Sequence, residues 1–299
     1  MAAHVFDRLI ELCESTRSRV CVGLDPHYEL LPPDTKGRGP IRHVRDFLFE
    51  ILAALEGAVP CVKPQIAFFE ALGPEGYALY FDVIRESHRR GFFVVGDIKR
   101  ADIGSTATAY AKGHLAADDG SAADAVTLNP YLGSDGIEPF LKVGRTKGRG
   151  VFVLARTSNP SSKEFQNLRE GGPAGDPLYM KVGRTLETWG ATNRGMRGYT
   201  DVGAVVGATH PDEGAELRRA LPQTFFLVPG YGAQGGTAAD VARTFASDGH
   251  GAIVNSSRGI LFAWKDAPNG ADRFAELARA AAIATTKAIN DALAARQKS

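Results

Sequence analysis

Two carboxylates and an ammonium group stand close together in residues 96–104 (GDIKRADIG), where they could act in acid–base or electrostatic catalysis. These charged groups belong to Asp97, Lys99 and Asp102. They follow the apolar run 92–95, which is predicted to be a buried strand, so the charges stand at its end. Because side chains alternate along a strand, we expect Asp97 and Lys99 to point to the same side. A surface ion-pair cluster is the alternative interpretation.

A glycine-rich segment, residues 229–236 (PGYGAQGG), could bind an anion together with Arg258. Backbone N–H groups of such a loop and a planar guanidinium group both suit a phosphate. Glycine-rich loops more often form only tight turns. The position of this loop shortly before residues 256–258 (SSR) nevertheless favours a phosphate site.

Eight short apolar runs, each closed by a polar residue or a glycine, are predicted to be the strands that position these groups. Their near-continuous apolarity is typical of strands buried on both faces, as in a parallel sheet. The runs are residues 19–25, 61–69, 92–99, 125–130, 150–156, 202–209, 224–230 and 251–257. Helical patterns between or after them cover residues 44–55, 74–90, 176–191, 211–220, 238–246 and 271–296.

This alternation predicts an α/β fold, a (β/α)8 TIM barrel, with residues 1–299 forming a single domain. A doubly wound open sheet is the alternative, and the eighth strand with its closing helix favours the barrel. A long polar βα loop is expected at about residues 158–175. Such a loop could be a lid over the active-site face or an insertion without function.

In a barrel, the C-terminal ends of all strands converge on one pocket. The polar residues predicted to lie there are Asp25, Lys63, Asp97, Lys99, Asn129, Thr157, Ser158, Asn255, Ser256, Ser257 and Arg258. Lys63 lies in an apolar strand and could instead extend its ammonium group to water. Two lysines and two aspartates at the ends of the first three strands favour a functional site. His27, Asn129, Tyr131 and His210 also lie near strand ends, and the sequence assigns them no role.

The composition excludes several other classes of function. Hydrophobic residues make up 44% of the chain and charged residues 23%, which is typical of a globular protein. The net charge of +1 gives no overall field that would attract nucleic acid or a membrane surface. The three scattered cysteines are expected to be buried free thiols. With no predicted signal peptide and no apolar run of about 20 residues, we expect a cytoplasmic protein.

The segment 97–103 resembles the D-x-K-x-x-D-[IV] signature of orotidine 5′-phosphate decarboxylases. Four other segments are similar to motifs of that family and occur in the same order. They are residues 23–26 (GLDP), 62–65 (VKPQ), 229–235 (PGYGAQG) and 257–259 (SRG). The resemblance extends from the first predicted strand to the eighth. The length and the long loop after the fifth strand resemble the larger bacterial subgroup, type 2.

The resemblance implies decarboxylation of orotidine 5′-monophosphate to uridine 5′-monophosphate (UMP) and CO2, the last step of de novo UMP synthesis. It implies no metal and no organic cofactor. Lys99 would protonate C6 of the pyrimidine, and Lys63, Asp97 and Asp102 would complete an alternating charge array. The substrate-binding residues implied by the resemblance are Asp25, Lys63, Ile103, Thr106, Ser158, Gln234, Gly235 and Arg258. The resemblance also implies a homodimer in which Asp102, Ile103 and Thr106 complete the neighbouring subunit's site.

Two rival functions follow from the same residues. A magnesium-dependent enzyme acting on a sugar phosphate could share the D-x-K-x-x-D pattern, but such enzymes carry an acidic residue at the position of Lys63. A lysine there disfavours a metal site. A barrel that only binds nucleotides would need the phosphate site without the charge array, so Asp97, Lys99 and Asp102 argue against it.

Overall fold

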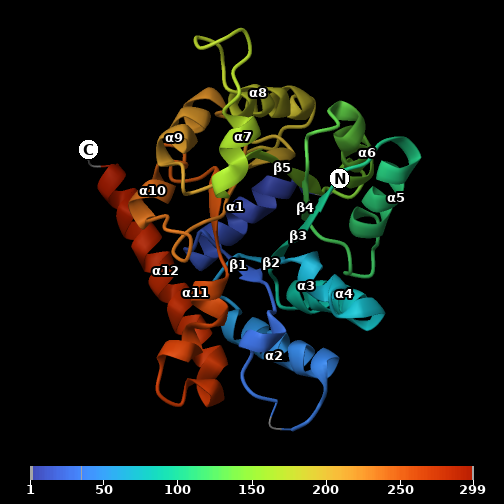
Figure 1. The fold of residues 1–299 in the computed structure, drawn as a ribbon, viewed down its shortest axis with the longest axis vertical. Helices are drawn as coiled ribbons and strands as arrows, with labels where there is room; N and C mark the ends of the chain where they lie inside the picture. The colour runs from blue at the N-terminus through green and yellow to red at the C-terminus, as the bar shows by residue number, and fades with distance from the viewer. Residues whose placement is uncertain (1–2, 35, 298–299) are drawn as a thin grey trace.

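Eight parallel strands close into a barrel in the order β1 to β8 in the computed structural model, which describes residues 3–34 and 36–297 (Figure 1). The ends of the predicted 1–299 domain lie outside the described residues. The strands are β1 (Val20–Leu24), β2 (Cys61–Pro64), β3 (Phe93–Arg100), β4 (Ala125–Leu128), β5 (Gly150–Arg156), β6 (Val202–Val206), β7 (Phe226–Val228) and β8 (Ala252–Ser256). The predicted (β/α)8 TIM barrel is therefore confirmed, and the open sheet is excluded.

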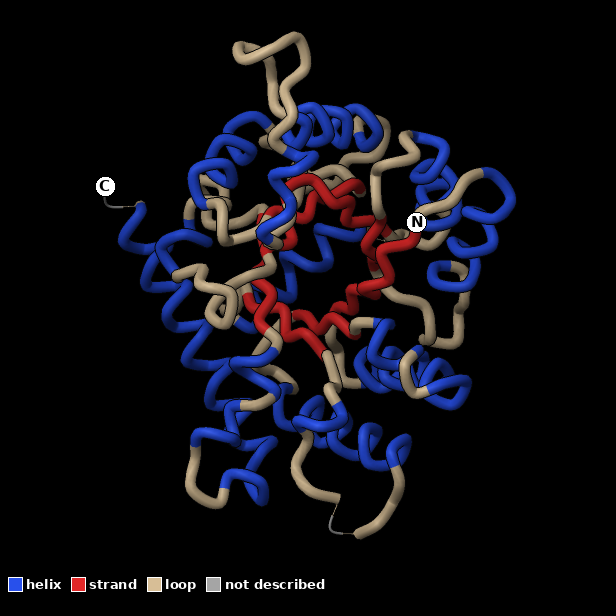
Figure 2. Tube along the Cα trace, viewed as in Figure 1, coloured by secondary structure: helices blue, strands red, loops and turns tan. Residues whose placement is uncertain are grey.

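Helices lie around this ring of strands, and one of them crosses it (Figure 2). They are α1 (Val5–Thr16), α2 (Pro40–Leu55), α3 (Ile66–Glu70), α4 (Gly73–Arg89), α5 (Gly104–Leu115), α6 (Ser134–Arg145), α7 (Lys163–Gln166), α8 (Leu178–Gly190), α9 (Pro211–Ala220), α10 (Ala238–Ala242), α11 (Arg258–Leu261) and α12 (Phe274–Arg296). Short 3-10 turns are η1 (Tyr28–Leu30), η2 (Pro160–Ser162), η3 (Ala263–Asp266) and η4 (Gly270–Arg273). In the described part of the chain, no helix is long and apolar enough to cross a membrane.

Several of these helices lie outside the segments that the sequence pattern predicts to be helical, among them α5 and α6. The predicted strand 61–69 is also too long, because β2 ends at Pro64 and α3 follows it. Helix α5 is short of large apolar residues, and its buried face is formed mainly by Ala107, Ala111 and Leu115. Helix α6 contains Pro139 in its interior, a residue that ordinarily ends or kinks a helix. Packing between α5 and α6 and against the sheet therefore outweighs weak local propensity.

The N-terminal end of the barrel is filled by aromatic side chains beneath α1, which lies across the ring in Figure 1. Phe6 of α1 packs against Phe152 at 5.1 Å and Phe225 at 4.9 Å between ring centroids. The three cysteines are buried free thiols, and Cys21 and Cys61 lie side by side in this inner layer. Only the C-terminal end of the barrel is left for a cavity.

Asp124, immediately before β4, ties three elements together at the N-terminal end. Its carboxylate is bonded to Arg8 of α1 at 2.9 Å, to His88 of α4 at 2.9 Å and to the Val94 backbone N–H of β3 at 2.8 Å. Burial by itself would raise the pKa of Asp124, but these partners lower it. Burial would lower the pKa of His88, but the bond to Asp124 raises it above 6.5.

We expect this pair to give the unfolding free energy a defined pH dependence. A raised histidine pKa stabilises the fold fully below pH 6.5, and this contribution is lost as pH rises through the folded-state pKa. The lowered pKa of Asp124 contributes above its unfolded value and is lost as pH falls toward the folded one. Replacing His88 with Gln should therefore lower stability by about 1.5 kcal/mol at pH 6 and flatten the decline between pH 6 and pH 8.

Urea unfolding at several pH values measures this effect. His43→Gln is a matched control, because the ring nitrogen of His43 is bonded to the neutral Pro32 carbonyl oxygen and its ring packs edge-on against Tyr28. That control should keep the pH slope of the unchanged protein. If the unfolding free energy of His88→Gln depended on pH as in the unchanged protein, the His88–Asp124 pair would not be the source of this pH dependence.

Candidate active site

A cavity of about 530 Å3 opens at the C-terminal ends of the strands, a volume suited to a nucleotide-sized ligand. It brings together seven residues to which the family resemblance gives a role. They are Asp25, Lys63, Asp97, Lys99, Ser158, Gln234 and Arg258. Four other residues that the sequence places near strand ends also line it, namely His27, Thr157, Asn255 and Ser257, whereas Asn129 and Ser256 do not.

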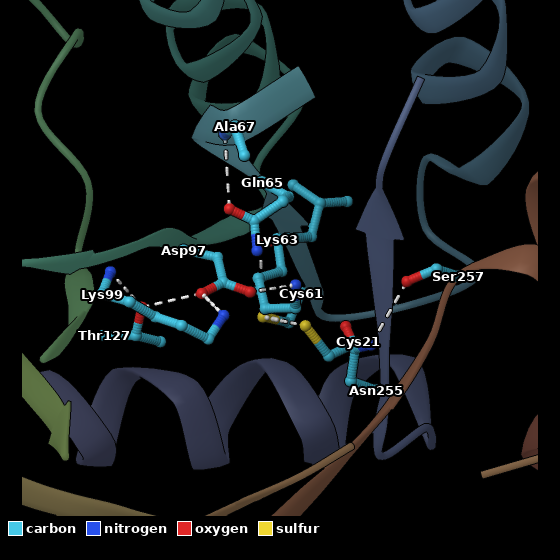
Figure 3. Close-up of polar contacts among 11 residues, drawn as sticks. Cys21, Cys61, Lys63, Gln65, Ala67, Asp97, Lys99, Thr127, Asn255 and Ser257 are labelled. Carbon is cyan, nitrogen blue, oxygen red and sulfur yellow. Dashed lines mark hydrogen bonds and ion pairs between the residues drawn. The ribbon is translucent and has the colours of Figure 1, made fainter. Parts of the chain in front are cut away.

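Asp97 holds one lysine on each of its carboxylate oxygens (Figure 3). Lys63 Nζ lies 2.6 Å from Oδ2, and Lys99 Nζ lies 2.5 Å from Oδ1. Asp97 is 4% exposed and Lys63 5% exposed, so both charges are held out of bulk water. The arrangement carries a net charge of +1 where it faces the cavity.

Electrostatics keep these buried groups ionised. Burial would raise the pKa of Asp97, but the charges of Lys63 and Lys99 hold it well below its usual range. Burial would likewise lower the pKa of Lys63, but Asp97 and then Asp25 raise it above its ordinary value. At neutral pH, Asp97 is therefore a carboxylate and Lys63 an ammonium.

The end of β3 is bulged at the charged residues. Gly96 pairs with Val126 and Arg100 pairs with Leu128, so residues 97–99 stand opposite one residue of β4. Lys99 has a φ of +44°, which is rare for a residue with a β-carbon. Lys99 and Asp97 both line the cavity, as expected. The bulge brings them there, because side chains do not alternate regularly in this part of β3.

Four residues to which the resemblance gives a role do not line this chain's cavity. Asp102 Oδ1 accepts a hydrogen bond from the Ile103 backbone N–H at 2.8 Å. Ile103 is 53% exposed and lines a separate, open groove beside α5, α6 and α8, and Thr106 is exposed on α5. Gly235 belongs to the loop after β7 but does not line the cavity.

The loop after β7 brings Gln234 next to Ser158 of the β5 end. Gly230, Gly232 and Gly235 all have positive φ values, and Gly236 N–H donates to the Gly230 carbonyl at 3.1 Å, so the loop folds tightly back. A β-carbon on Gly230 would lie 3.3 Å from Gln234 Oε1 and 3.4 Å from Ser158 Cβ. The missing side chain thus lets these two residues approach each other.

Two buried carboxyl or amide oxygens at the cavity, Asp25 Oδ1 and Asn255 Oδ1, have no hydrogen-bond partner within the described residues. A β-carbon on Gly23 would overlap Ser257 Oγ and lie 3.3 Å from Asn255 Oδ1, so glycine makes room for this polar corner. Hydroxyl groups of a ligand would satisfy both oxygens. The sequence places Asn255 at a strand end but assigns it no function; its amide within an apolar run is the one signal for it.

Arg156, at the end of β5, was not identified from the sequence, yet it fixes one wall of the cavity. It is 1% exposed and donates to Glu213 of α9, to Ser162 Oγ at 2.6 Å and to Gln166 Oε1 at 3.1 Å. Gln166 also accepts from the Thr157 N–H at 2.9 Å and donates to its hydroxyl at 2.7 Å. The guanidinium group therefore clamps α7 onto the strand end.

The segment predicted as one long polar loop has two different halves. Its first half contains η2 and α7, and Gln166 of α7 lines the cavity. Its second half projects away from the barrel beyond α7 (Figure 1). The first half is therefore part of the cavity wall, and the second half is the part that resembles an insertion.

The profile of the orotidine 5′-phosphate decarboxylase / HUMPS family matches residues 18–272. An orotidine 5′-phosphate decarboxylase of Rhodopirellula baltica is 45% identical over 263 residues, covering 84% of this chain and 85% of that protein. One from Clostridium perfringens is 42% identical over 293 residues, covering 97% of this chain and 99% of that protein. The solved structure of OMP decarboxylase from Leishmania donovani is 34% identical, with a TM-score of 0.76, over 97% of this chain and 98% of that one.

We expect Arg156→Met to loosen the cavity wall. The change removes the donors that hold Glu213, Ser162 and Gln166 while keeping an unbranched apolar stem. Loss of a buried ion pair with one partly exposed partner should lower the unfolding free energy by about 2–3 kcal/mol. Limited proteolysis should also cut residues 163–177 faster than in the unchanged protein.

Arg184→Met is the matched control for this prediction. Arg184 pairs with Asp176 at 3.1 Å in the same region, but both side chains are at least half exposed. Its loss should cost less than about 1 kcal/mol. Equal destabilisation by the two substitutions in urea would contradict the clamp.

Proposed function

The chain belongs to the orotidine 5′-phosphate decarboxylase family, and from this premise we propose how its residues divide the work. The enzyme is a carboxy-lyase that converts orotidine 5′-monophosphate to UMP and CO2, the last step of UMP synthesis. The observation that carries the proposed mechanism is the buried Lys63–Asp97–Lys99 array at the cavity.

Lys99 supplies both positive charge and a proton. When the bond between C6 and the carboxylate breaks, CO2 leaves and the electron pair stays on C6. An ammonium group already in place stabilises this charge without reorganising, because its position is fixed before the reaction. Lys99 Nζ then gives its proton to C6, and the resulting amine regains a proton from solvent.

Asp97 and Lys63 hold that ammonium group in place. Asp97 binds Lys99 at 2.5 Å through one oxygen, while Lys63 holds the other oxygen at 2.6 Å. The depressed pKa of Asp97 means that it stays ionised, so it does not take the proton meant for C6. Lys63 therefore has two roles: it fixes the position of the Asp97 carboxylate, and it contacts the substrate.

The substrate spans the mouth of the barrel. Gln234 and Arg258 hold the phosphate beside β7 and β8, with Gly235 in the same loop. Asp25 and Lys63 hold ribose hydroxyls beside β1 and β2, which is supported by the unpartnered Asp25 Oδ1. Ser158 contacts the pyrimidine ring at the end of β5, and its closeness to Gln234 across Gly230 supports placing ring and phosphate loop side by side.

The active unit is a homodimer. Asp102, Ile103 and Thr106 do not line their own cavity and would complete the site of the partner subunit. Two observations support this: Ile103 is 53% exposed, and Tyr131, 86% exposed, follows the neighbouring strand β4. Exposed apolar side chains beside an open groove are typical of a protein–protein contact.

Lys99→Ala should lower kcat by about 10⁴-fold or more, because it removes both the proton donor and the preset charge. Binding of UMP should remain measurable, since the phosphate and ribose contacts are kept. The assay is the ultraviolet absorbance change of orotidine 5′-monophosphate, run with excess EDTA. Lys287→Ala is the control, because Lys287 is exposed on α12 and pairs only with Asp291 among the described residues.

Wild-type-like turnover by Lys99→Ala would refute the proposed mechanism. Loss of wild-type activity in EDTA, restored by magnesium, would support a metal-dependent reaction instead. If the unchanged protein bound the nucleotide but did not convert it, the result would support a barrel that binds nucleotides without catalysing a reaction.

Mixing two inactive variants tests the shared site. Lys99→Ala and Asp102→Ala homodimers should each be inactive, because every site in them lacks one group. A mixed dimer has one site with both groups intact, so random exchange of subunits should restore about a quarter of wild-type activity. If activity does not return although mixed dimers form, Asp102 serves its own chain.

A further inference from the structure

Thr127 of β4 lies directly opposite the bulge that carries the two charged residues of β3. It is 1% exposed and lines the cavity. Its hydroxyl donates to Asp97 Oδ1 at 2.8 Å and accepts from the Lys99 backbone N–H at 3.0 Å (Figure 3). No motif in the sequence includes it, and the roles proposed above do not use it.

These contacts close a ring that begins and ends on Lys99. The Lys99 N–H donates to the Thr127 hydroxyl, which donates to Asp97 Oδ1. The same oxygen accepts from Lys99 Nζ at 2.5 Å. One hydroxyl therefore links the backbone of the lysine to the carboxylate that holds the tip of its side chain.

The backbone of Lys99 needs such a partner. The bulge withdraws residues 97–99 from the regular pairing with β4, and pairing resumes where the Asn129 N–H donates to the Arg100 carbonyl at 3.1 Å. The φ of +44° at Lys99 is unfavourable for a side chain with a β-carbon and persists only where surrounding contacts impose it. The Thr127 hydroxyl is the group that takes up the Lys99 N–H in this conformation.

We propose that Thr127 is a positioning residue for decarboxylation, fixing the direction and reach of the Lys99 ammonium group through Asp97 and the Lys99 backbone. This inference rests on the proposed role of Lys99 as proton donor. Thr127 itself need not touch the reacting carbon. Its removal should misplace the ammonium group in the transition state more than it weakens substrate binding, which depends on residues around the rest of the mouth.

The alternative is that Thr127 only satisfies buried polar groups of the barrel. In that case, removing its hydroxyl would lower stability and leave turnover unchanged. Thr244 provides the comparison, because it is also 1% exposed and its hydroxyl donates to the Val241 carbonyl at 2.7 Å, away from the cavity.

The experiment compares Thr127→Val, Thr127→Ser and Thr244→Val in full-length protein by kcat, KM and thermal unfolding. Valine keeps the branched shape of threonine but removes both hydrogen bonds, whereas serine keeps the hydroxyl. Thr127→Val should lose about 10- to 100-fold in kcat, with KM changed by less than about threefold. Thr127→Ser should recover most of the loss, and Thr244→Val should turn over like the unchanged protein.

Thr127→Ala replaces the valine variant if the latter does not fold, and the same loss in kcat is expected. Unchanged kcat in a folded Thr127→Val or Thr127→Ala protein would overturn the inference. An equal loss in Thr127→Ser would also overturn it, because the hydroxyl is then not the group that matters. If Lys99→Ala retains activity, the proposed role of Lys99 as proton donor is wrong. The Lys99 variant therefore distinguishes failure of the proposed mechanism from failure of the inference on Thr127.

Discussion

The buried carboxylate of Asp97 is the constraint on which the rest of this structure depends. An isolated carboxylate at this depth would be too costly to keep ionised, so Lys63 and Lys99 must both be in place. The three groups come from only two strands, β2 and β3, and their geometry therefore depends on how β3 ends. The bulge opposite Thr127 sets that ending, and the closed barrel holds the two strands beside each other.

Around this array, the barrel assigns different tasks to different parts of its rim. The β7 and β8 loops supply groups suited to an anion, and β1 and β8 supply oxygens that lack partners within the described protein. The β5 end is held by Arg156, which connects the strand to α7 and α9. The side chains that face the cavity are thus supported by contacts that do not face it.

Much of this could be predicted from the sequence, because the signals were local. The apolar runs located the strands, and the spacing of Asp97 and Lys99 marked two residues that meet at the cavity, whereas Asp102 of the same motif does not line it. Other features depend on distant partners and leave no local pattern. The backbone N–H of Lys99 is bonded to Thr127 of the next strand. In the sequence, Arg156 is an ordinary charged residue at the end of a strand, and only the fold places Glu213 and Gln166 beside it. Helix α6 was missed because Pro139 argues against a helix unless tertiary packing is known.

The helix α1 and the aromatic layer beneath it fill the opposite end of the barrel. A nucleotide can therefore arrive and depart only through the mouth, and the two events cannot overlap in time. UMP and orotidine 5′-monophosphate must compete for one passage, so each turnover waits for the vacated site. With the phosphate held by Gln234 and Arg258 as proposed, UMP would have to release those contacts before it could leave. Tight binding of the phosphate, useful for capturing the substrate, would then slow the release of the product.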